Sequence, residues 1–210
     1  MSRRRCGSAK NAGVTDETLR TYQARAERYV ANDHEPSADV LAWQRRFVEL
    51  LPAEAVVLEI GSGPGRDADR LEALGIRVQR TDATPACVDR LRALGREARV
   101  LDVRHDPLPV GLDGVFANAV LLHLGREELA SVLVRIHDAL RPGGVLACSL
   151  KEGDGEERHS RKLGLPRHFT YWRAELLQDA LEVAGFAVLS IERSQGDTDD
   201  WLQVLARRAA

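Results

Sequence analysis

Hydrophobic residues at helical spacing predict two helices near the start of the chain. The first is expected after Thr15 and carries Tyr22 and Tyr29 on one apolar face. The second is expected to bury Trp43 and to end before Pro52, because proline seldom continues a helix. The pattern of apolar and polar positions then changes.

From residue 56 onward, short apolar runs alternate with amphipathic segments. The predicted strands are residues 56–60, 76–81, 99–103, 114–118, 145–150, 186–192 and 201–206. The predicted helices are residues 66–74, 127–140 and 172–184, and one that begins at Pro85 after the capping Thr84. Such alternation predicts an α/β fold, a single Rossmann-like doubly wound sheet of about seven strands with helices on both faces. The last two strands have no helix between them, so we expect an antiparallel hairpin at one edge.

Three segments outside this alternation complete the predicted organisation. Residues 1–13 are basic and almost free of apolar side chains, which predicts a disordered tail, and residues 14–55 are expected to form a helical lid on the main domain, residues 56–210. Residues 151–171 are rich in charge and glycine, which is typical of a lid or binding loop. We expect Lys151, Arg167 and Tyr171 in this loop to make polar contacts with a substrate.

Composition narrows the class of protein. The chain has 210 residues, 44% hydrophobic and 30% charged, with a formal net charge of −2. This length suits one domain, and the near-neutral charge does not favour nucleic acid or an anionic membrane as a partner. Cys6, Cys87 and Cys148 lie far apart, so they predict neither disulfides nor a metal site, and reduced thiols favour a cytoplasmic location. No apolar stretch is long enough to cross a bilayer, and no secretory signal is recognisable.

A glycine-rich loop follows the first predicted strand. Gly61, Gly63 and Gly65 allow the backbone to turn sharply and approach a ligand, and the next helix points its free N–H groups at the same place. The second predicted strand ends in Asp82, where a carboxylate can accept hydrogen bonds from both hydroxyls of a ribose. Together these features predict a ligand that contains adenosine.

The spacing of the glycines separates several kinds of adenosine ligand. A dinucleotide fingerprint requires a third glycine where this chain has Arg66, which disfavours an NAD-dependent oxidoreductase. A Walker A loop, which binds the phosphates of a nucleoside triphosphate, would require a lysine that this loop lacks. The loop instead resembles that of the class I S-adenosylmethionine-dependent methyltransferases.

Four stretches carry this resemblance, which extends over residues 56–208. They are residues 57–66 (VLEIGSGPGR), 81–85 (TDATP), 116–124 (FANAVLLHL) and 140–146 (LRPGGVL). Residues 149–156 and 168–172 are similar to a subgroup of small bacterial methyltransferases. The resemblance implies a Rossmann-like fold and S-adenosyl-L-methionine as the cofactor.

The resemblance also implies a role for individual residues. The glycine loop with Ser62 would hold the methionine part of the cofactor, and Glu59 would orient that loop or the cofactor's amino group. Asp82 would bind the ribose, and Ala83 would lie beside the adenine. Asp102 would accept from the adenine amino group, although Asp106 is an alternative, and the backbone carbonyl of Asn118 would accept from the cofactor's ammonium. The implied cofactor-binding set is Tyr22, Tyr29, Glu59, Gly61, Ser62, Gly63, Gly65, Arg66, Asp82, Ala83, Asp102 and Asn118.

The reaction needs few catalytic side chains, because the methyl group of a sulfonium is already activated. A general base is needed only where the acceptor must lose a proton. His123 follows the fourth predicted strand on the side of the methyl group, and the near-neutral pKa typical of histidine suits a base. A structural role for His123 is the alternative.

Several functions remain open from the residues alone. We expect a small-molecule acceptor, with oxygen or nitrogen as the acceptor atom, and a monomer or homodimer. The alternatives are an RNA, tRNA or protein methyltransferase and a module that binds the cofactor without catalysis. Nucleic acid is disfavoured because Asn118 is followed by Ala-Val-Leu, where amino-group methyltransferases of bases carry Pro-Pro and an aromatic residue.

Overall fold

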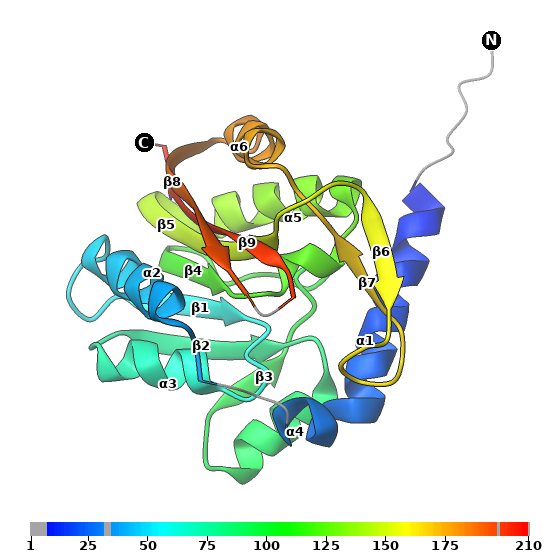
Figure 1. Ribbon diagram of the computed structural model, residues 1–210. Helices are drawn as coiled ribbons and strands as arrows, with labels where there is room; N and C mark the ends of the chain where they lie inside the picture. The colour runs from blue at the N-terminus through cyan, green and yellow to red at the C-terminus, as the bar shows by residue number, and fades with distance from the viewer. Residues whose placement is uncertain (1–7, 32–34, 197, 210) are drawn as a thin grey trace.

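The computed structural model describes residues 8–31, 35–196 and 198–209. In this part of the chain, a seven-stranded sheet has the strand order β3-β2-β1-β4-β5-β9-β8, and a separate two-stranded sheet pairs β6 with β7. Helices cover both faces of the large sheet (Figure 1). The predicted fold class is confirmed.

The large sheet has a parallel part and an antiparallel edge. Its strands are β1 (Val56–Ile60), β2 (Arg77–Asp82), β3 (Ala98–Val100), β4 (Leu112–Ala117), β5 (Leu140–Lys151), β8 (Phe186–Gln195) and β9 (Asp200–Arg208). Strands β1 to β5 pair in parallel, whereas β9 is antiparallel to β5 and to β8. The predicted hairpin therefore forms, with β9 between β5 and the edge strand β8.

Helices pack two apolar layers against the sheet. α2 (Ala38–Glu49) and α3 (Arg66–Ala73) cover one face, where Trp43 and Phe47 of α2 pack on Phe116 of β4. α5 (Arg126–Ala139) and α6 (Ala174–Val183) cover the other face. α4 (Pro85–Ala93) connects β2 to β3. Residues 14–55 are thus not all a lid, because α2 is part of the core.

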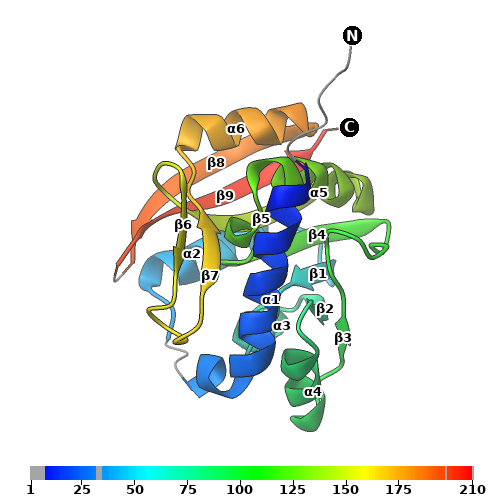
Figure 2. The same cartoon turned by 90° about the vertical axis from the view of Figure 1, so that its right-hand side faces the viewer.

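Helix α1 (Ser8–Ala31) runs across the carboxyl ends of the parallel strands, as Figure 2 shows. It is kinked at Arg25, whose φ of −129° and ψ of 22° are not helical. The helix begins earlier than predicted, since residues 8–13 were expected to belong to the disordered tail. Residues 1–7 of the predicted tail lie outside the described residues.

The segment 151–171, predicted to be a lid or binding loop, has regular structure. It contains the antiparallel strands β6 (Glu156–His159) and β7 (Arg167–Thr170). Two threonines of α1 bind the backbone of this hairpin: Thr18 Oγ1 accepts from His168 N at 2.9 Å, and Thr21 Oγ1 donates to the carbonyl of Pro166 at 2.6 Å. The hairpin depends on contacts with a distant helix, which local sequence does not reveal.

Candidate active site

The glycine loop lies where β1 ends, next to the switch point between β1 and β4. Gly61 has a φ of +73° and Gly63 a φ of +48°, a left-handed region that favours glycine. A Cβ at Gly61 would lie 2.4 Å from a methyl carbon of Val120, so the approach of the two segments also requires glycine. The sequence therefore fixes an open backbone turn at the carboxyl end of the sheet, where α/β folds bind ligands.

The carboxylate of Asp82 connects this loop to the end of β2. Its Oδ2 accepts from Gly63 N at 2.9 Å, and its Oδ1 accepts from Thr84 N at 2.8 Å. Burial raises the pKa of Asp82, although both N–H groups favour the ionised form. The carboxylate is thus fixed in orientation, with lone pairs left for a ligand.

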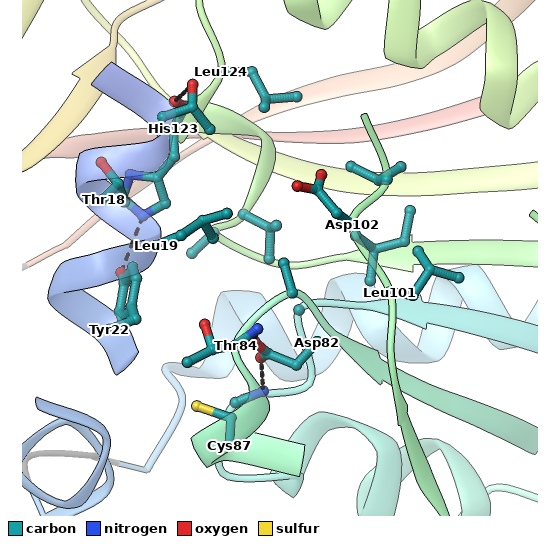
Figure 3. A pocket seen from close by; sticks show the side chains of 18 of the residues that line it. Thr18, Leu19, Tyr22, Asp82, Thr84, Cys87, Leu101, Asp102, His123 and Leu124 are labelled. Carbon is teal, nitrogen blue, oxygen red and sulfur yellow. Dashed lines mark hydrogen bonds between the residues drawn. The ribbon is translucent and has the colours of Figure 1, made fainter. Parts of the chain in front are cut away.

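Asp82 opens into a cavity under helix α1. Figure 3 shows Tyr22 and His123 on one side of this cavity and Asp82 and Asp102 on the other. Nine of the predicted site residues line it: Tyr22, Tyr29, Gly61, Gly63, Asp82, Ala83, Asp102, Asn118 and His123. Residues that are far apart in the sequence are therefore gathered around one space.

The remaining predicted cofactor residues lie beneath or beside the cavity. Glu59 is buried below the loop and accepts a hydrogen bond from the Ser62 hydroxyl. Burial raises the pKa of Glu59 to about 8, so this carboxyl group is protonated at neutral pH. A Cβ at Gly65 would meet Leu91, and Arg66 forms an ion pair with Glu35 at 3.1 Å.

Asp102 and Asp106 have different surroundings. Asp102 lines the cavity and binds the guanidinium of Arg104. Burial alone would raise its pKa, but the hydrogen bonds from Arg104 hold the pKa of Asp102 below its usual value. Asp106 accepts from the backbone N–H of Asp102 at 2.8 Å and is not in the lining. The geometry thus favours Asp102 over Asp106 as the cavity carboxylate.

The chain after β4 is held in a strained turn. Ala119 has a φ of +56°, and its N–H donates to Ser149 Oγ at 2.8 Å. The same hydroxyl donates to Asn118 Oδ1 at 2.7 Å, while Asn118 Nδ2 donates to Asp67 at 2.9 Å. Because the Asn118 side chain is occupied, its backbone is the part that remains to face a ligand.

His123 takes part in a chain of hydrogen bonds that defines its tautomer. Nδ1 lies 2.6 Å from the carbonyl of His168, which can only accept, so Nδ1 carries the proton. Nε2 must then accept from the Tyr22 hydroxyl, 3.0 Å away, and that hydroxyl accepts from Arg167 Nη1 at 3.0 Å. Burial lowers the pKa of His123 to about 3, which corrects the expected near-neutral value.

Of the predicted substrate residues, His123 lines the cavity, but the three in the segment 151–171 do not. Lys151 pairs with Asp199 at 2.7 Å, and its ammonium lies 4.3 Å from the centre of the Phe169 ring. The Tyr171 hydroxyl lies 3.2 Å from Asp199, and burial raises its pKa. Arg167 donates a hydrogen bond to the Tyr22 hydroxyl and lies behind that side chain. These residues form the layer behind the cavity wall.

A second, open cleft adjoins the cavity. The two spaces share Tyr29, Gly61, Asn118 and Ala119 in their linings. Arg66, Ser149 and Trp201 are among the other residues of the cleft. A second ligand could therefore approach the cavity from this side.

Sequence reasoning missed several cavity residues. Thr15 and Thr18 line the cavity from α1, and Leu101 and Val103 line it from the segment after β3. The threonines recur every three residues at 15, 18 and 21 and are all buried, which is the one local signal that could have identified this helix face. Within residues 8–31, 35–196 and 198–209, no cluster of three or more histidine, cysteine or acidic residues could hold a metal ion, and no helix could span a membrane.

The fold is an α/β fold with a cavity at the switch point of its sheet, lined by the glycine loop and Asp82. A family model described as a methyltransferase domain matches residues 29–191, and the chain belongs to this family. The match confirms the resemblance to class I S-adenosylmethionine-dependent methyltransferases, and with it the class of enzyme. None of the curated proteins compared with the chain matches it.

Many solved structures share the fold. The DhpI-SAM-HEP complex is 22% identical with a TM-score of 0.74, covering 93% of this chain and 98% of that one. The CcbJ methyltransferase from Streptomyces caelestis is 20% identical with a TM-score of 0.72, covering 90% and 98%. The 1,6-didemethyltoxoflavin-N1-methyltransferase from Burkholderia thailandensis, bound to 1,6-didemethyltoxoflavin and S-adenosylhomocysteine, is 23% identical with a TM-score of 0.69, covering 100% and 94%.

Proposed function

We propose that this enzyme transfers the methyl group of S-adenosyl-L-methionine to oxygen or nitrogen of a small molecule by in-line displacement. The observation that carries the proposal is the Asp82 carboxylate, which two backbone N–H groups hold toward the same cavity as Gly61 and Gly63. A fixed carboxylate beside a glycine turn suits a ribose joined to an amino-acid chain. The Burkholderia enzyme is bound to S-adenosylhomocysteine, the demethylated form of this cofactor, and to the small molecule 1,6-didemethyltoxoflavin.

The residues around the cavity fit the parts of this cofactor. Asp82 would accept from the ribose hydroxyls, and Ala83 and Asp102 would contact the adenine. The loop of Gly61, Ser62, Gly63 and Gly65, with Glu59 and Arg66 at its two ends, would hold the methionine part. The Asn118 carbonyl would accept from the ammonium, and Tyr22 or Tyr29 would close the site from α1. A Cβ at Gly63 would lie 3.0 Å from the Tyr29 ring, so glycine leaves space at this point.

The protein's contribution to catalysis is mainly placement. S-adenosyl-L-methionine supplies an activated methyl group, so the chain needs to hold donor and acceptor in line and exclude water. Such placement lowers a barrier by about 7–11 kcal/mol. The acceptor would approach through the open cleft, whose lining shares Asn118 and Ala119 with the cavity. Lys151, Arg167 and Tyr171 do not line the cavity and would support its wall, Arg167 through its hydrogen bond to Tyr22.

For an acceptor that must lose a proton, His123 is the proposed base. Its Nε2 is occupied by the Tyr22 hydroxyl, so we propose that this hydroxyl takes the acceptor's proton while its own proton passes to Nε2. The low pKa of His123 makes it a weak base, which suits an acceptor with an acidic proton.

A small acceptor is favoured over a macromolecule because helix α1 covers the cavity, and the β6–β7 hairpin packs against this helix. An RNA or protein acceptor is the second candidate, since one similar structure is a complex of a putative methyltransferase with the Haloferax volcanii Trm112 activator. A monomer or homodimer remains the prediction for the assembly. The free thiols of Cys87 and Cys148 support a cytoplasmic location.

The test is a transfer assay with S-adenosyl-L-methionine labelled in its methyl group. The panel contains small metabolites with hydroxyl or amino groups, and also total RNA and unfolded protein. We expect label in at least one small molecule, and none with the Asp82→Asn variant. Label found only in RNA or protein would overturn the proposal of a small acceptor.

A further inference from the structure

Three arginine side chains of the described residues are buried, and they differ in how their charge is balanced. Arg80 is 5% exposed and forms ion pairs with Asp69 and Glu72 at 2.8 and 2.7 Å. The Arg104 side chain is 6% exposed and forms ion pairs with Asp16 and Asp102. Arg167 is 6% exposed, yet no carboxylate of the described chain lies within ion-pair distance of it.

The contacts that Arg167 does make are neutral. Nη1 donates to the Tyr22 hydroxyl, and the guanidinium lies 5.6 Å from the Tyr22 ring centre and 5.0 Å from that of Phe169. Its Nε is buried and has no hydrogen-bond partner in the described part of the molecule. Aromatic faces offset only part of the cost of removing a charge from water. The Nε–H group of Arg167 therefore lacks an acceptor, and its positive charge lacks a carboxylate in contact with it.

The neighbouring charges do not balance Arg167. The Lys151 ammonium also lies near the Phe169 ring, at 4.3 Å from its centre, and its charge is balanced by Asp199. His123 and His168 lie close by, and burial keeps His123 neutral. The carboxylates of Asp199 and Glu156 contact Lys151 and His168, not Arg167.

The Arg167 guanidinium also lies close to the space where ligands would bind. Tyr22 lines the cavity, and its hydroxyl is the group that separates Arg167 from it. Nη1 of Arg167 would open to the cavity when the Tyr22 side chain turns aside, and the hydroxyl would then leave Nε2 of His123. The released hydroxyl could donate to the same ligand atom, so anion binding and the proton relay use alternative positions of Tyr22.

We propose that Arg167 and the Tyr22 hydroxyl form a binding site for an anionic oxygen group, such as a carboxylate or phosphate, carried by the methyl acceptor. This inference rests on the proposed function and specifies its substrate as an anionic small molecule. Arginine suits the site, because its planar guanidinium can donate two parallel hydrogen bonds to such a group. The methionine carboxylate of the cofactor has the same chemistry, so the experiment must distinguish the two sources.

The first arm compares S-adenosylhomocysteine with 5′-methylthioadenosine, which lacks the amino-acid part. Calorimetry measures the dissociation constants of both for the wild type and for Arg167→Met. We expect both constants to change less than about threefold, because the anion belongs to the acceptor. A tenfold loss for S-adenosylhomocysteine alone would overturn this assignment and give the site to the cofactor. Binding by the wild type separately tests the proposed function.

The second arm detects the anion site directly, with chloride as the probe. The ³⁵Cl NMR line width is measured on protein saturated with S-adenosylhomocysteine. We expect excess broadening in the wild type, which formate reverses by competition and which Arg167→Met abolishes. The exposed Arg161 on the same hairpin provides a matched control, since Arg161→Met should leave the broadening unchanged.

A conservative variant keeps the second arm decisive if Arg167→Met folds poorly. Arg167→Lys retains the charge, so it should retain part of the broadening while Arg161→Met retains all of it. Equal line widths for the wild type and both Arg167 variants would overturn the proposal.

Discussion

The Tyr22 hydroxyl donates a hydrogen bond to Nε2 of His123 across 3.0 Å, joining helix α1 to the end of β4 over the cavity. The direction of this bond follows from the other ring nitrogen, which donates to the carbonyl of His168. Because Nε2 is occupied, His123 cannot contact an acceptor without the participation of Tyr22. This hydrogen bond therefore makes helix α1 part of the proposed proton transfer.

Replacing His123 should slow methyl transfer without removing the cofactor. For an acceptor that must lose a proton, we expect His123→Ala to lower the rate by roughly 10²-fold, the lower range of general-base effects. Tyr22→Phe should have a comparable effect, because it removes the hydroxyl that passes the proton to Nε2. Single-turnover rates with the acceptor identified in the transfer assay would measure both.

The exposed His105 provides the control for these variants. His105→Ala should retain the wild-type rate, and all three variants should bind S-adenosylhomocysteine with similar affinity. An unchanged rate for His123→Ala would remove this residue as the base. A slow His123→Ala with a fully active Tyr22→Phe would instead exclude the relay.

The protonated Glu59 should make stability depend on pH. Its pKa is about 8 in the folded protein and near 4.5 when unfolded, so the folded state holds a proton that the unfolded state releases between these values. Protonation of Glu59 therefore contributes fully to the free energy of unfolding below pH 4.5. This contribution is lost as the pH rises toward 8, by up to about 1.4 kcal/mol per pH unit.

Glu59→Gln is the variant that tests this titration. Its side chain is neutral at every pH, so its free energy of unfolding should fall less between pH 5 and pH 8 than that of the wild type. Urea denaturation at both pH values provides the comparison. Parallel pH dependence in the two proteins would show that Glu59 is ionised in the folded state.

Gly61→Ala should damage the site more than an equivalent change elsewhere. Gly75 has a similar positive φ of +87°, but a Cβ there would meet nothing within 4 Å, whereas a Cβ at Gly61 would collide with Val120. We expect each variant to lose about 1 kcal/mol of stability from backbone strain. Only Gly61→Ala should also lose cofactor affinity, by at least about tenfold. Equal affinities would contradict the role of the close approach to Val120.

Much of the fold could be predicted because its signals are local. Glycines at 61, 63 and 65, proline at 85 and the alternation of apolar runs each specify a turn, a helix start or a strand within a few residues. Even the antiparallel edge followed from the absence of a helix between two strands. The cavity residues Asp82 and Asn118 could be found because each lies at or just after the end of a strand.

The parts that escaped prediction depend on contacts between distant segments. The β6–β7 hairpin is bound to threonines of α1, more than a hundred residues away. The low pKa of His123 comes from burial under Tyr22 and Phe169, which the identity of the residue does not indicate. Lys151 and Tyr171 were expected to contact a substrate, but their polar atoms are engaged by Asp199.

The most direct test of the account is a calorimetric titration of S-adenosylhomocysteine into the wild type, Asp82→Asn and Asp89→Asn. Asp89 lies on α4 with its side chain 74% exposed, so it controls for the loss of a charge. We predict one site in the wild type and in Asp89→Asn, with affinity reduced by roughly tenfold or more in Asp82→Asn, as expected for charged hydrogen bonds. Equal affinity in all three proteins, or no binding by the wild type, would contradict the assignment of this cavity to the cofactor.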